Sequence, residues 1–257
     1  MTQITLSPRQ SEILAAARRD GAASISALAA SLGVSLETVR RDIRPLVEDG
    51  HLVKTHGTVH LPEHGREAPF DRRMRENAAE KRRIARHVAA RIADGDSIMM
   101  DTGTTTSILA RELSARRELT IVTNSSDVAR TLATVNGNKV FMAGGELHGD
   151  NGAAFGRTAI DFVARFRVRH AIISIGAIDA RMGPMDYLLE EAEFARTVLS
   201  CGASRIVATD HTKFERTALV KVCDFDGFDL LVTDRPPPVE IAEAIAAAGA
   251  RWEVAEG

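Results

Sequence analysis

Six short apolar runs alternate with segments of helical periodicity between residues 97 and 248. The runs cover residues 97–101, 119–123, 139–143, 171–175, 205–209 and 229–233, and helices are expected near 105–114, 126–134, 157–165, 188–200 and 238–248. This alternation predicts a mainly parallel sheet with helices on both faces, which is an α/β fold. Ligands bind such sheets beyond the carboxyl ends of the strands. The residues that follow each run are therefore the first candidates for a site.

Small or polar residues follow five of these runs. The first run ends in Asp101-Thr102-Gly103-Thr104-Thr105-Thr106 and leads directly into a helix, where backbone N–H groups and hydroxyls would converge on an anion. A threonine-rich helix start also serves as a purely structural cap, and the sequence leaves both interpretations open. Hydroxyls, amides and a lysine suit a phosphate, whereas carboxylates and amides suit sugar or polyol hydroxyls. The other runs are followed by Thr123 and Asn124, by Gly144 and Gly145, by Gly176 and Asp179, and by Asp210 with Lys213.

Three short helices are expected in the first fifty residues. Ser7-Pro8 starts the first, Ser26 is expected to cap the second, and Ser35 is expected to cap the third after the turn at Gly33. One face of the third helix is apolar, which turns the opposite face outward. That outward face carries Glu37, Arg41 and Arg44, with Thr38 and Arg40 at its flanks.

Two short helices around a glycine turn are typical of a helix-turn-helix. Arginine forks suit guanine edges or phosphates, and a hydroxyl at a helix start reaches phosphate oxygens. Residues 51–61 predict two short strands around a turn, a wing on which Lys54 and His56 would touch DNA phosphates. The alternative is a plain three-helix bundle whose arginines only face solvent.

Residues 62–69 are rich in turn formers and charge and nearly free of bulky apolar side chains, which is typical of a hinge. We therefore expect a winged helix-turn-helix at 1–61, a linker at 62–75 and a second domain at 76–257, with helical periodicity over 72–93. The first 92 residues carry 16 basic and 11 acidic side chains, and the remainder carries 17 and 24. A slightly basic head on an acidic body permits contact with a polyanion through the head alone.

Membrane, secreted and metal-binding classes are not expected. The longest apolar runs, about five residues, are far short of the roughly 20 that a membrane-spanning helix needs, and the N-terminus does not resemble a secretory signal. We expect a cytoplasmic protein without a membrane partner. Cys201 and Cys223 form no CxxC pair, and the four histidines between residues 51 and 64 fit no metal-ligand spacing. No disulfide, metal site or cofactor is expected, and both cysteines are expected to be buried.

The segment Ser35-Leu36-Glu37-Thr38-Val39-Arg40-Arg41-Asp42-Ile43, followed by Lys54-Thr55-His56-Gly57, resembles the N-terminal module of the DeoR family of bacterial transcription regulators. Residues 95–235 resemble the effector domain of the same family, whose fold is shared with ribose-5-phosphate isomerase. The resemblance implies a sugar-phosphate-sensing pocket. Carried over to this sequence, the pocket comprises residues 101–106, Thr123, Asn124, Gly144, Gly145, Gly176, Asp179, Glu191 and Lys213.

Three segments, 143–147, 210–214 and 233–238, resemble the glycerol-3-phosphate-regulon branch of this family. The resemblance implies a repressor of a carbohydrate or polyol operon that binds double-stranded operator DNA and is released by a phosphorylated effector, glycerol 3-phosphate or another sugar phosphate. A dimer or tetramer is expected, because one head of this size makes too few DNA contacts for useful specificity. The alternative is a sugar-phosphate isomerase or deaminase with Asp179 as base and Lys213 as electrophilic helper. Against it, no second acid stands next to Asp179.

Overall fold

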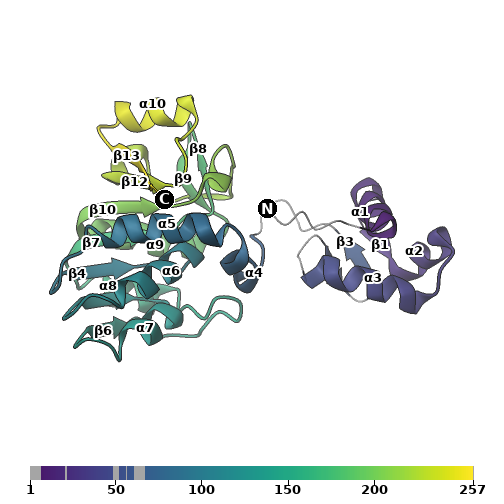
Figure 1. The fold of residues 1–257 in the computed structure, drawn as a ribbon, viewed down its shortest axis with the longest axis horizontal. Coiled ribbons are helices and arrows are strands. Elements are labelled where there is room, and N and C mark those ends of the chain that lie inside the picture. Colours follow the sequence, from purple (N-terminus) through teal and green to yellow (C-terminus); the bar gives the residue numbers. More distant parts are fainter. Residues whose placement is uncertain (1–6, 21, 49–51, 56, 61–66, 257) are drawn as a thin grey trace. The chain divides into compact units, whose positions relative to one another are not determined.

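The computed structural model describes residues 7–20, 22–48, 52–55, 57–60 and 67–256 (Figure 1). The chain divides into two compact units, residues 1–68 and 69–257, each with its own apolar core. The division falls within the range 62–75 that the sequence assigns to a linker. Residues 70–75 of that range form a helix of the second unit.

The N-terminal unit packs three helices against a small antiparallel sheet. Its elements are α1 (Pro8–Asp20), β1 (Ala22–Ser24), α2 (Ile25–Leu32), α3 (Leu36–Glu48), β2 (Val53–Thr55) and β3 (Thr58–His60). The strand order is β1-β3-β2, so the expected hairpin gains a third strand that the sequence did not predict. Its core is built from Ile13, Leu28, Val39, Ile43 and Leu52, all at most 2% exposed.

Local hydrogen bonds explain where these helices begin and end. At the start of α1, the Ser7 side chain accepts the Gln10 N–H, and the Gln10 side chain accepts the Ser7 N–H. Ser7 therefore caps α1, as the Ser7-Pro8 start predicts. The prediction that Ser26 caps α2 is wrong: the side chain of Ser24 accepts the Ala27 N–H at 3.0 Å, because the chain enters α2 from β1 in an extended conformation. Gly33 ends α2 with φ of 63°, a left-handed conformation that favours glycine.

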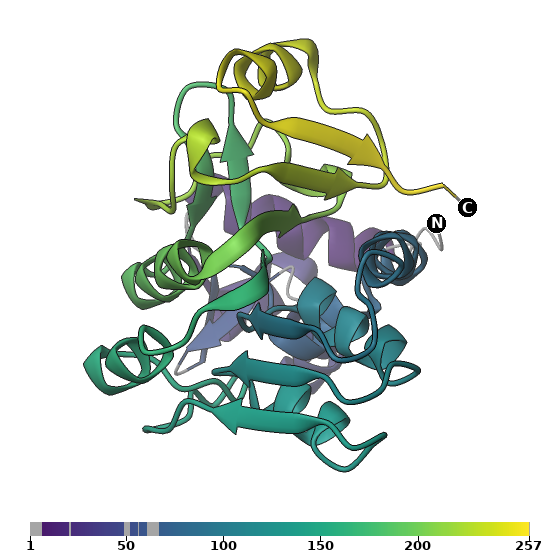
Figure 2. The ribbon, with the colours of Figure 1, turned by 90° about the vertical axis from the view of Figure 1, so that its left-hand side faces the viewer.

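The C-terminal unit is a seven-stranded sheet in which every strand pair is parallel, in the order β13-β12-β10-β7-β4-β5-β6. Figure 2 shows helices on both sides of this sheet. This confirms the predicted α/β class. The elements are α4 (Phe70–Arg75), α5 (Ala78–Ala89), β4 (Ser97–Met100), α6 (Thr104–Leu113), β5 (Thr120–Thr123), α7 (Ser126–Leu132), β6 (Lys139–Met142), α8 (Arg157–Val163), β7 (Val168–Ile173), β8 (Ala177–Asp179), β9 (Gly183–Asp186), α9 (Leu189–Cys201), β10 (Gly202–Ala208), η1 (His211–Lys213), β11 (Val220–Lys221), η2 (Phe225–Gly227), β12 (Leu230–Thr233), α10 (Val239–Ala247) and β13 (Arg251–Val254).

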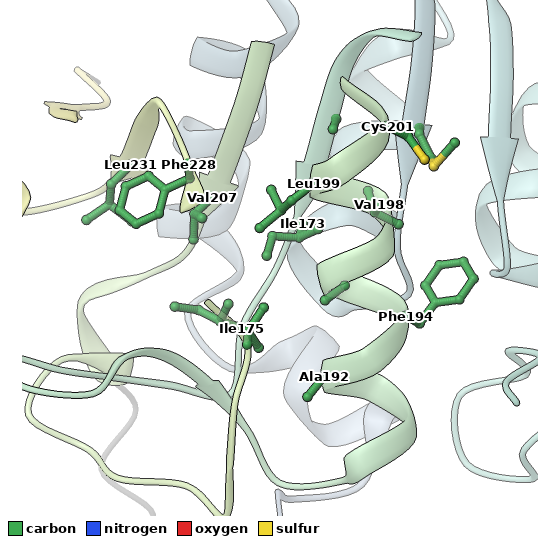
Figure 3. Close-up of a cluster of buried hydrophobic side chains, with 14 of the residues drawn as sticks. Ile173, Ile175, Ala192, Phe194, Val198, Leu199, Cys201, Val207, Phe228 and Leu231 are labelled. Carbon is green, nitrogen blue, oxygen red and sulfur yellow. The ribbon is translucent and has the colours of Figure 1, made fainter. Parts of the chain in front are cut away.

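Two apolar clusters hold the helices to the sheet. Helices α5, α6 and α7 share one cluster with the sheet, and α8, α9 and α10 share the other. Figure 3 shows the second cluster, in which Leu199 of α9 lies beside Ile173 of β7, and Val207 of β10 lies beside Phe228 and Leu231. This packing holds α9 against the sheet. The N-terminal end of α9 is thereby positioned at the carboxyl edge of the strands.

Three features differ from the sequence-based expectation. The helical periodicity over 72–93 is divided into α4 and α5 at Asn77, whose φ of 51° interrupts a helix. Strands β8, β9 and β11 form a separate antiparallel sheet that was not predicted. Cys201 is buried as expected, whereas Cys223 is half-buried, and both thiols are free.

None of the described helices combines the length and apolar content that a membrane crossing requires. Within the same residues, no group of three or more His, Cys, Asp or Glu side chains is arranged to hold a metal ion.

Candidate functional site

The outward face of α3 is strongly basic. Glu37, Arg40, Arg41 and Arg44 recur at positions i, i+3, i+4 and i+7, and all four are exposed. They line a groove of about 440 Å³ whose other wall includes Lys54 of β2, so four cations face one carboxylate there. The guanidinium of Arg40 lies 3.6 Å from the Glu37 carboxylate, and both side chains are exposed. An exposed pair of this kind is weak, and the other cations leave the groove positive. This surface suits a polyanion.

Ser35 and Thr38 shape the start of α3. The Ser35 side chain accepts the Thr38 N–H at 3.1 Å, and the two hydroxyl oxygens are 2.9 Å apart. Ser35 is therefore the N-cap of α3, as predicted. The helix continues through Pro45 to Glu48, although Pro45 has no N–H to donate to the Arg41 carbonyl. His56, the other predicted wing contact, lies outside the described residues.

Helix α1 packs against α3 and bonds to it at Asp42. The Arg9 guanidinium donates to the Asp42 carboxylate at 2.7 Å, and the Gln10 side chain donates to the Asp42 carbonyl at 3.3 Å. Asp42 is thus neutralised by a partner within its own unit. Arg40 and Arg41 stay exposed on the face that lines the groove.

In the C-terminal unit, Asp101 is a buried carboxylate at the end of β4. It is 5% exposed, and its two oxygens accept the Ser174 N–H at 3.2 and 3.1 Å. Burial raises the pKa of Asp101 well above its ordinary value, and the carboxylates of Asp186 and Glu191 raise it further. The hydrogen bond from the Ser174 N–H and the proximity of the Thr106 hydroxyl oppose this rise in pKa. Three carboxylates from β4, β9 and α9 therefore act on one another at this edge.

The threonine-rich segment after Asp101 is tightly packed. Gly103 caps α6, and a Cβ added there would lie 1.8 Å from the Ser174 Oγ, so only glycine fits between the ends of β4 and β7. Thr104, Thr105 and Thr106 are all buried, and Thr106 donates its hydroxyl to the Gly103 carbonyl at 3.1 Å. The Thr106 hydroxyl thus has a structural partner, whereas the backbone N–H groups of the first turn of α6 are the part suited to an anion.

The next strand end contributes Thr123 and Asn124, both completely buried. The Thr123 hydroxyl accepts the Ser125 N–H at 3.1 Å, and Asn124 donates through Nδ2 to the Ala154 carbonyl at 2.9 Å. Within the described part of the chain, the buried Oγ1 of Thr102 and Oδ1 of Asn124 have no hydrogen-bond partner. Buried polar atoms without a partner are suited to a ligand that supplies one.

The loop after β6 runs along the same edge. Gly144 and Gly145 are exposed, and Gly145 has φ of 149° with the Ala154 Cβ nearby. Farther along, Asn151 donates to the Glu191 carboxylate at 3.3 Å, which fixes this loop to the first turn of α9. Gly144 and Gly145, the predicted site residues of this loop, therefore lie near the carboxyl edge of the sheet and are not buried there.

Gly176 and Asp179 are at opposite ends of β8. The Gly176 N–H donates to the Asp186 carboxylate at 2.7 Å, and a Cβ at Gly176 would meet the Tyr187 ring at 2.8 Å. Asp179 instead accepts the N–H groups of Arg181 and Met182 at 2.8 and 2.9 Å, which lowers its pKa. Gly176 and Asp179 are three residue steps apart in an extended segment, which corresponds to about 10 Å. The structure therefore brings Asp186, and not Asp179, beside Asp101.

Asp186 escaped the sequence-based prediction although a signal for it exists. Asp179 followed by Gly183, whose φ is 79°, is typical of a tight turn. A turn there returns the chain as β9 and pairs Met185 with Ala177. The residue after Met185 must then lie opposite Gly176.

Lys81 is a second residue that sequence analysis missed. It lies in the first turn of α5, is 4% exposed, and donates from Nζ to the Arg73 carbonyl at 2.6 Å. Burial lowers the pKa of Lys81 to about 8; Asp210 opposes this shift, while Lys213 and Arg73 add to it. Lys213, a predicted site residue, is thus near Lys81. The signal was a lysine on the same helical face as the buried Ile84 and Val88.

Both compact units match known protein families. Residues 9–64 match the family described as DeoR-like helix-turn-helix domain, and residues 76–235 match the family described as DeoR C terminal sensor domain. Together these two matches include every site residue that the sequence predicts.

Two relatives are similar over nearly the whole chain. The sequence is 32% identical over 237 residues to the glycerol-3-phosphate regulon repressor of Escherichia coli (strain K12), covering 92% of this chain and 94% of that protein. It is 34% identical over 241 residues to the HTH-type transcriptional repressor CsqR of the same organism, covering 94% and 92%. Among solved structures, ribose 5-phosphate isomerase A of Methanocaldococcus jannaschii gives a TM-score of 0.40 at 14% identity, covering 54% of this chain and 55% of that one, too low to bear on function.

Proposed function

The chain belongs to the DeoR family of transcriptional regulators, and on that premise we propose that it represses a carbohydrate or polyol catabolic operon, acting in the cytoplasm on operator DNA. The observation that carries this proposal is the groove beside α3, where Arg40, Arg41 and Arg44 share one exposed face with Lys54 opposite. It is joined in one chain to a sensor unit whose buried polar edge suits a small ligand.

The DNA contacts we propose come from α3 and the wing. Arg41 and Arg44 would read base edges or phosphates in the major groove, with Arg40 and Lys54 on the phosphate backbone. Glu37 and Thr38 would complete the surface near the helix start, and Ser35, already bonded to Thr38, would hold that start in place. His56 is proposed as a wing contact from its sequence position alone.

The effector we propose is a phosphorylated polyol or sugar, with glycerol 3-phosphate preferred because one relative is named the glycerol-3-phosphate regulon repressor. The hydroxyls of such a ligand match the carboxylates and amides of Asp101, Glu191 and Asn124. Its phosphate matches the first turn of α6 and the ammonium of Lys213. Gly144, Gly145 and Gly176 would leave room for the ligand, and Asp179 would act only through the hairpin turn that it holds.

Release requires that effector binding disfavour the DNA-bound arrangement. We propose a dimer or tetramer whose paired α3 helices read half-sites about one helical turn apart. A rotation of the two heads relative to each other would then break simultaneous contact. In this proposal residues 1–61 form the DNA-binding domain and 76–257 the effector domain. The linker range 62–75 ends in α4, which belongs to the second compact unit.

An isomerase or deaminase is not favoured. Both relatives described above are named as repressors. Asp179, the base that such a reaction would need, is held by two backbone N–H groups that lower its pKa, which makes it a weaker base.

Selection from a random duplex library tests the regulatory function. The protein should enrich a sequence with two half-sites, and its affinity should fall steeply with salt because bound phosphates release counterions. Thermal unfolding with glycerol 3-phosphate beside unphosphorylated glycerol then tests the effector: a ligand at 100 times its Kd stabilises by about 2.7 kcal/mol. No enriched sequence, or a flat salt dependence, overturns the DNA assignment. No stabilisation by any phosphate ester overturns the effector site.

A further inference from the structure

Helix α4 is fastened at both of its ends. At its start, the Phe70 N–H donates to both oxygens of the Asp150 carboxylate, at 3.1 and 3.2 Å, and the Arg73 guanidinium lies 3.9 Å from the same carboxylate. At its end, the Arg73 carbonyl accepts a hydrogen bond of 2.6 Å from the ammonium of Lys81. Two separate side chains thus hold one six-residue helix.

Both fastening points belong to the edge that carries the candidate pocket. Asp150 lies in the loop after β6, one residue before Asn151, which bonds to Glu191. Lys81 lies in the first turn of α5, and α5 leads across the sheet to the start of β4, so its first turn is at the carboxyl edge of the strands. There α5 packs against α6, whose first turn is also at this edge.

The charges around Lys81 would favour an added anion. Lys213 and Arg73 are the cations that act on its ammonium, and Asp210 and Glu76 are the acids. Asp210 already accepts two hydrogen bonds from Thr212 and one from Asn77, at 2.5 to 3.4 Å. Glu76 accepts from Arg72 at 2.5 Å. The Asp210 carboxylate is thus held by hydrogen bonds and the Glu76 carboxylate by its pair with Arg72. Lys81 is buried and Lys213 is half-buried, and the two ammonium groups are close enough for Lys213 to lower the pKa of Lys81.

We propose that Lys81 joins Lys213 in holding the phosphate of the effector, and that Lys81 thereby leaves the Arg73 carbonyl and frees the C-terminal end of α4. This inference rests on the proposed function, because it requires a phosphorylated effector. A charge-assisted hydrogen bond to phosphate is about twice as strong as one to a neutral carbonyl. The Lys81 ammonium therefore binds the phosphate in preference to the Arg73 carbonyl. In chain order α4 is the first helix of the sensor unit, so its release changes how the preceding segment is held.

Hydrogen exchange of the α4 amides measures this release directly. In the wild-type protein, saturating glycerol 3-phosphate should speed exchange of the Glu76 amide, which bonds to the Arg72 carbonyl, at least five-fold. Lys81→Met removes the fastening group, so the same amide should exchange fast without ligand and should not respond to it. Lys139→Met, which removes an exposed lysine of β6, is the matched control and should behave as wild type.

Affinity measured by calorimetry gives a second, independent readout. Lys81→Met should bind glycerol 3-phosphate at least ten-fold more weakly than wild type or the control. Because the pKa of Lys81 is about 8, wild-type affinity should fall about ten-fold between pH 7 and pH 9. Lys81→Arg keeps its charge over this range, so its affinity should change much less with pH. This variant also carries the test if Lys81→Met fails to fold.

The outcomes separate this inference from the function on which it rests. If glycerol 3-phosphate binds the wild-type protein and releases operator DNA, but Lys81→Met binds it equally well or α4 exchange is unchanged, the inference is wrong and the proposed function stands. If neither glycerol 3-phosphate nor any other phosphate ester binds the wild-type protein, the effector assignment fails, and this inference fails with it.

Discussion

Asp101 and Ser174 tie the ends of β4 and β7 together, because both carboxylate oxygens of Asp101 accept the one backbone N–H of Ser174. The bond fixes a carboxyl group that is almost completely removed from water and lies among other carboxylates. An ionised group in such a place costs free energy, so the pKa of Asp101 is raised. The carboxyl group of Asp101 therefore retains its proton to a higher pH in the folded protein than in the unfolded chain.

Replacing Asp101 with Asn should stabilise the protein at neutral pH. Above the ordinary carboxyl pKa of 3.8, the unfolded chain releases its proton while the folded protein retains it, so the stability that Asp101 contributes is lost as pH rises through the folded pKa. Asn cannot ionise and keeps an oxygen for the Ser174 N–H. We therefore expect Asp101→Asn to be more stable than the wild-type protein at pH 7.

Urea unfolding at pH 4, 5.5 and 7 measures this gain, which should shrink as pH falls. Asp161→Asn is the control, since Asp161 is an exposed carboxylate of α8 paired with Arg157. Equal stability of Asp101→Asn and wild type at all three pH values would contradict the raised pKa.

Gly103→Ala should destabilise the sensor unit, because the new methyl group would overlap the Ser174 hydroxyl. The backbone of Gly103 is extended, with φ of 174°, so the cost is one of space alone. Overpacking of this kind costs about 1–3 kcal/mol. Ser174→Gly removes the obstacle, so the double variant should recover most of the lost stability in urea unfolding. If Gly103→Ala is as stable as wild type, the ends of β4 and β7 can move apart at little cost in free energy.

Much of the sensor fold could be predicted because its strands are apolar runs with helices between them. Residues 97–101 and 119–123 are examples, and each contains a central strand of the observed sheet. Strands β1, β8 and β11 have two or three residues, too few to show a period. Strands β1 and β11 also depend on pairing with strands that are distant in the sequence. Strand β13 lacks an apolar run and is held at the sheet edge by its pairing with β12.

The candidate site divides in the same way. Asp101 and Asn124 could be predicted because a strand end places them directly. Asp186 and Lys81 could not, because each reaches the edge through a second step. A hairpin must return to bring Asp186 opposite Gly176, and α5 must pack on the sheet to bury Lys81. Sequence analysis predicts a site residue when a single strand or helix places it at the edge of the sheet. It misses a residue whose position depends on how two elements pack or pair with each other.

Cys223 should be nearly inert toward alkylation in the folded protein. Burial raises the pKa of its thiol from 9.0 to about 12, with the nearby Asp224 carboxylate adding to the rise. At pH 8 the thiolate fraction should then be about 1,000-fold lower than in the unfolded chain. Iodoacetamide labelling of a Cys201→Ala variant, followed by mass spectrometry with and without urea, measures the ratio. Comparable rates in both states would contradict the raised pKa.

Arg41→Ala should weaken operator binding and leave glycerol 3-phosphate binding unchanged, because Arg41 lies on the exposed face of α3 in a unit with its own core. If Arg41 contacts a base edge, the loss should be about 1–3 kcal/mol on the selected operator and much smaller on random DNA. If it contacts a phosphate, both duplexes should lose affinity equally and the salt slope should fall by about one. Dissociation constants at four salt concentrations distinguish the two. Arg157→Ala removes an exposed arginine from α8 and is the matched control; an Arg41→Ala variant that behaves like this control would remove α3 from the DNA interface.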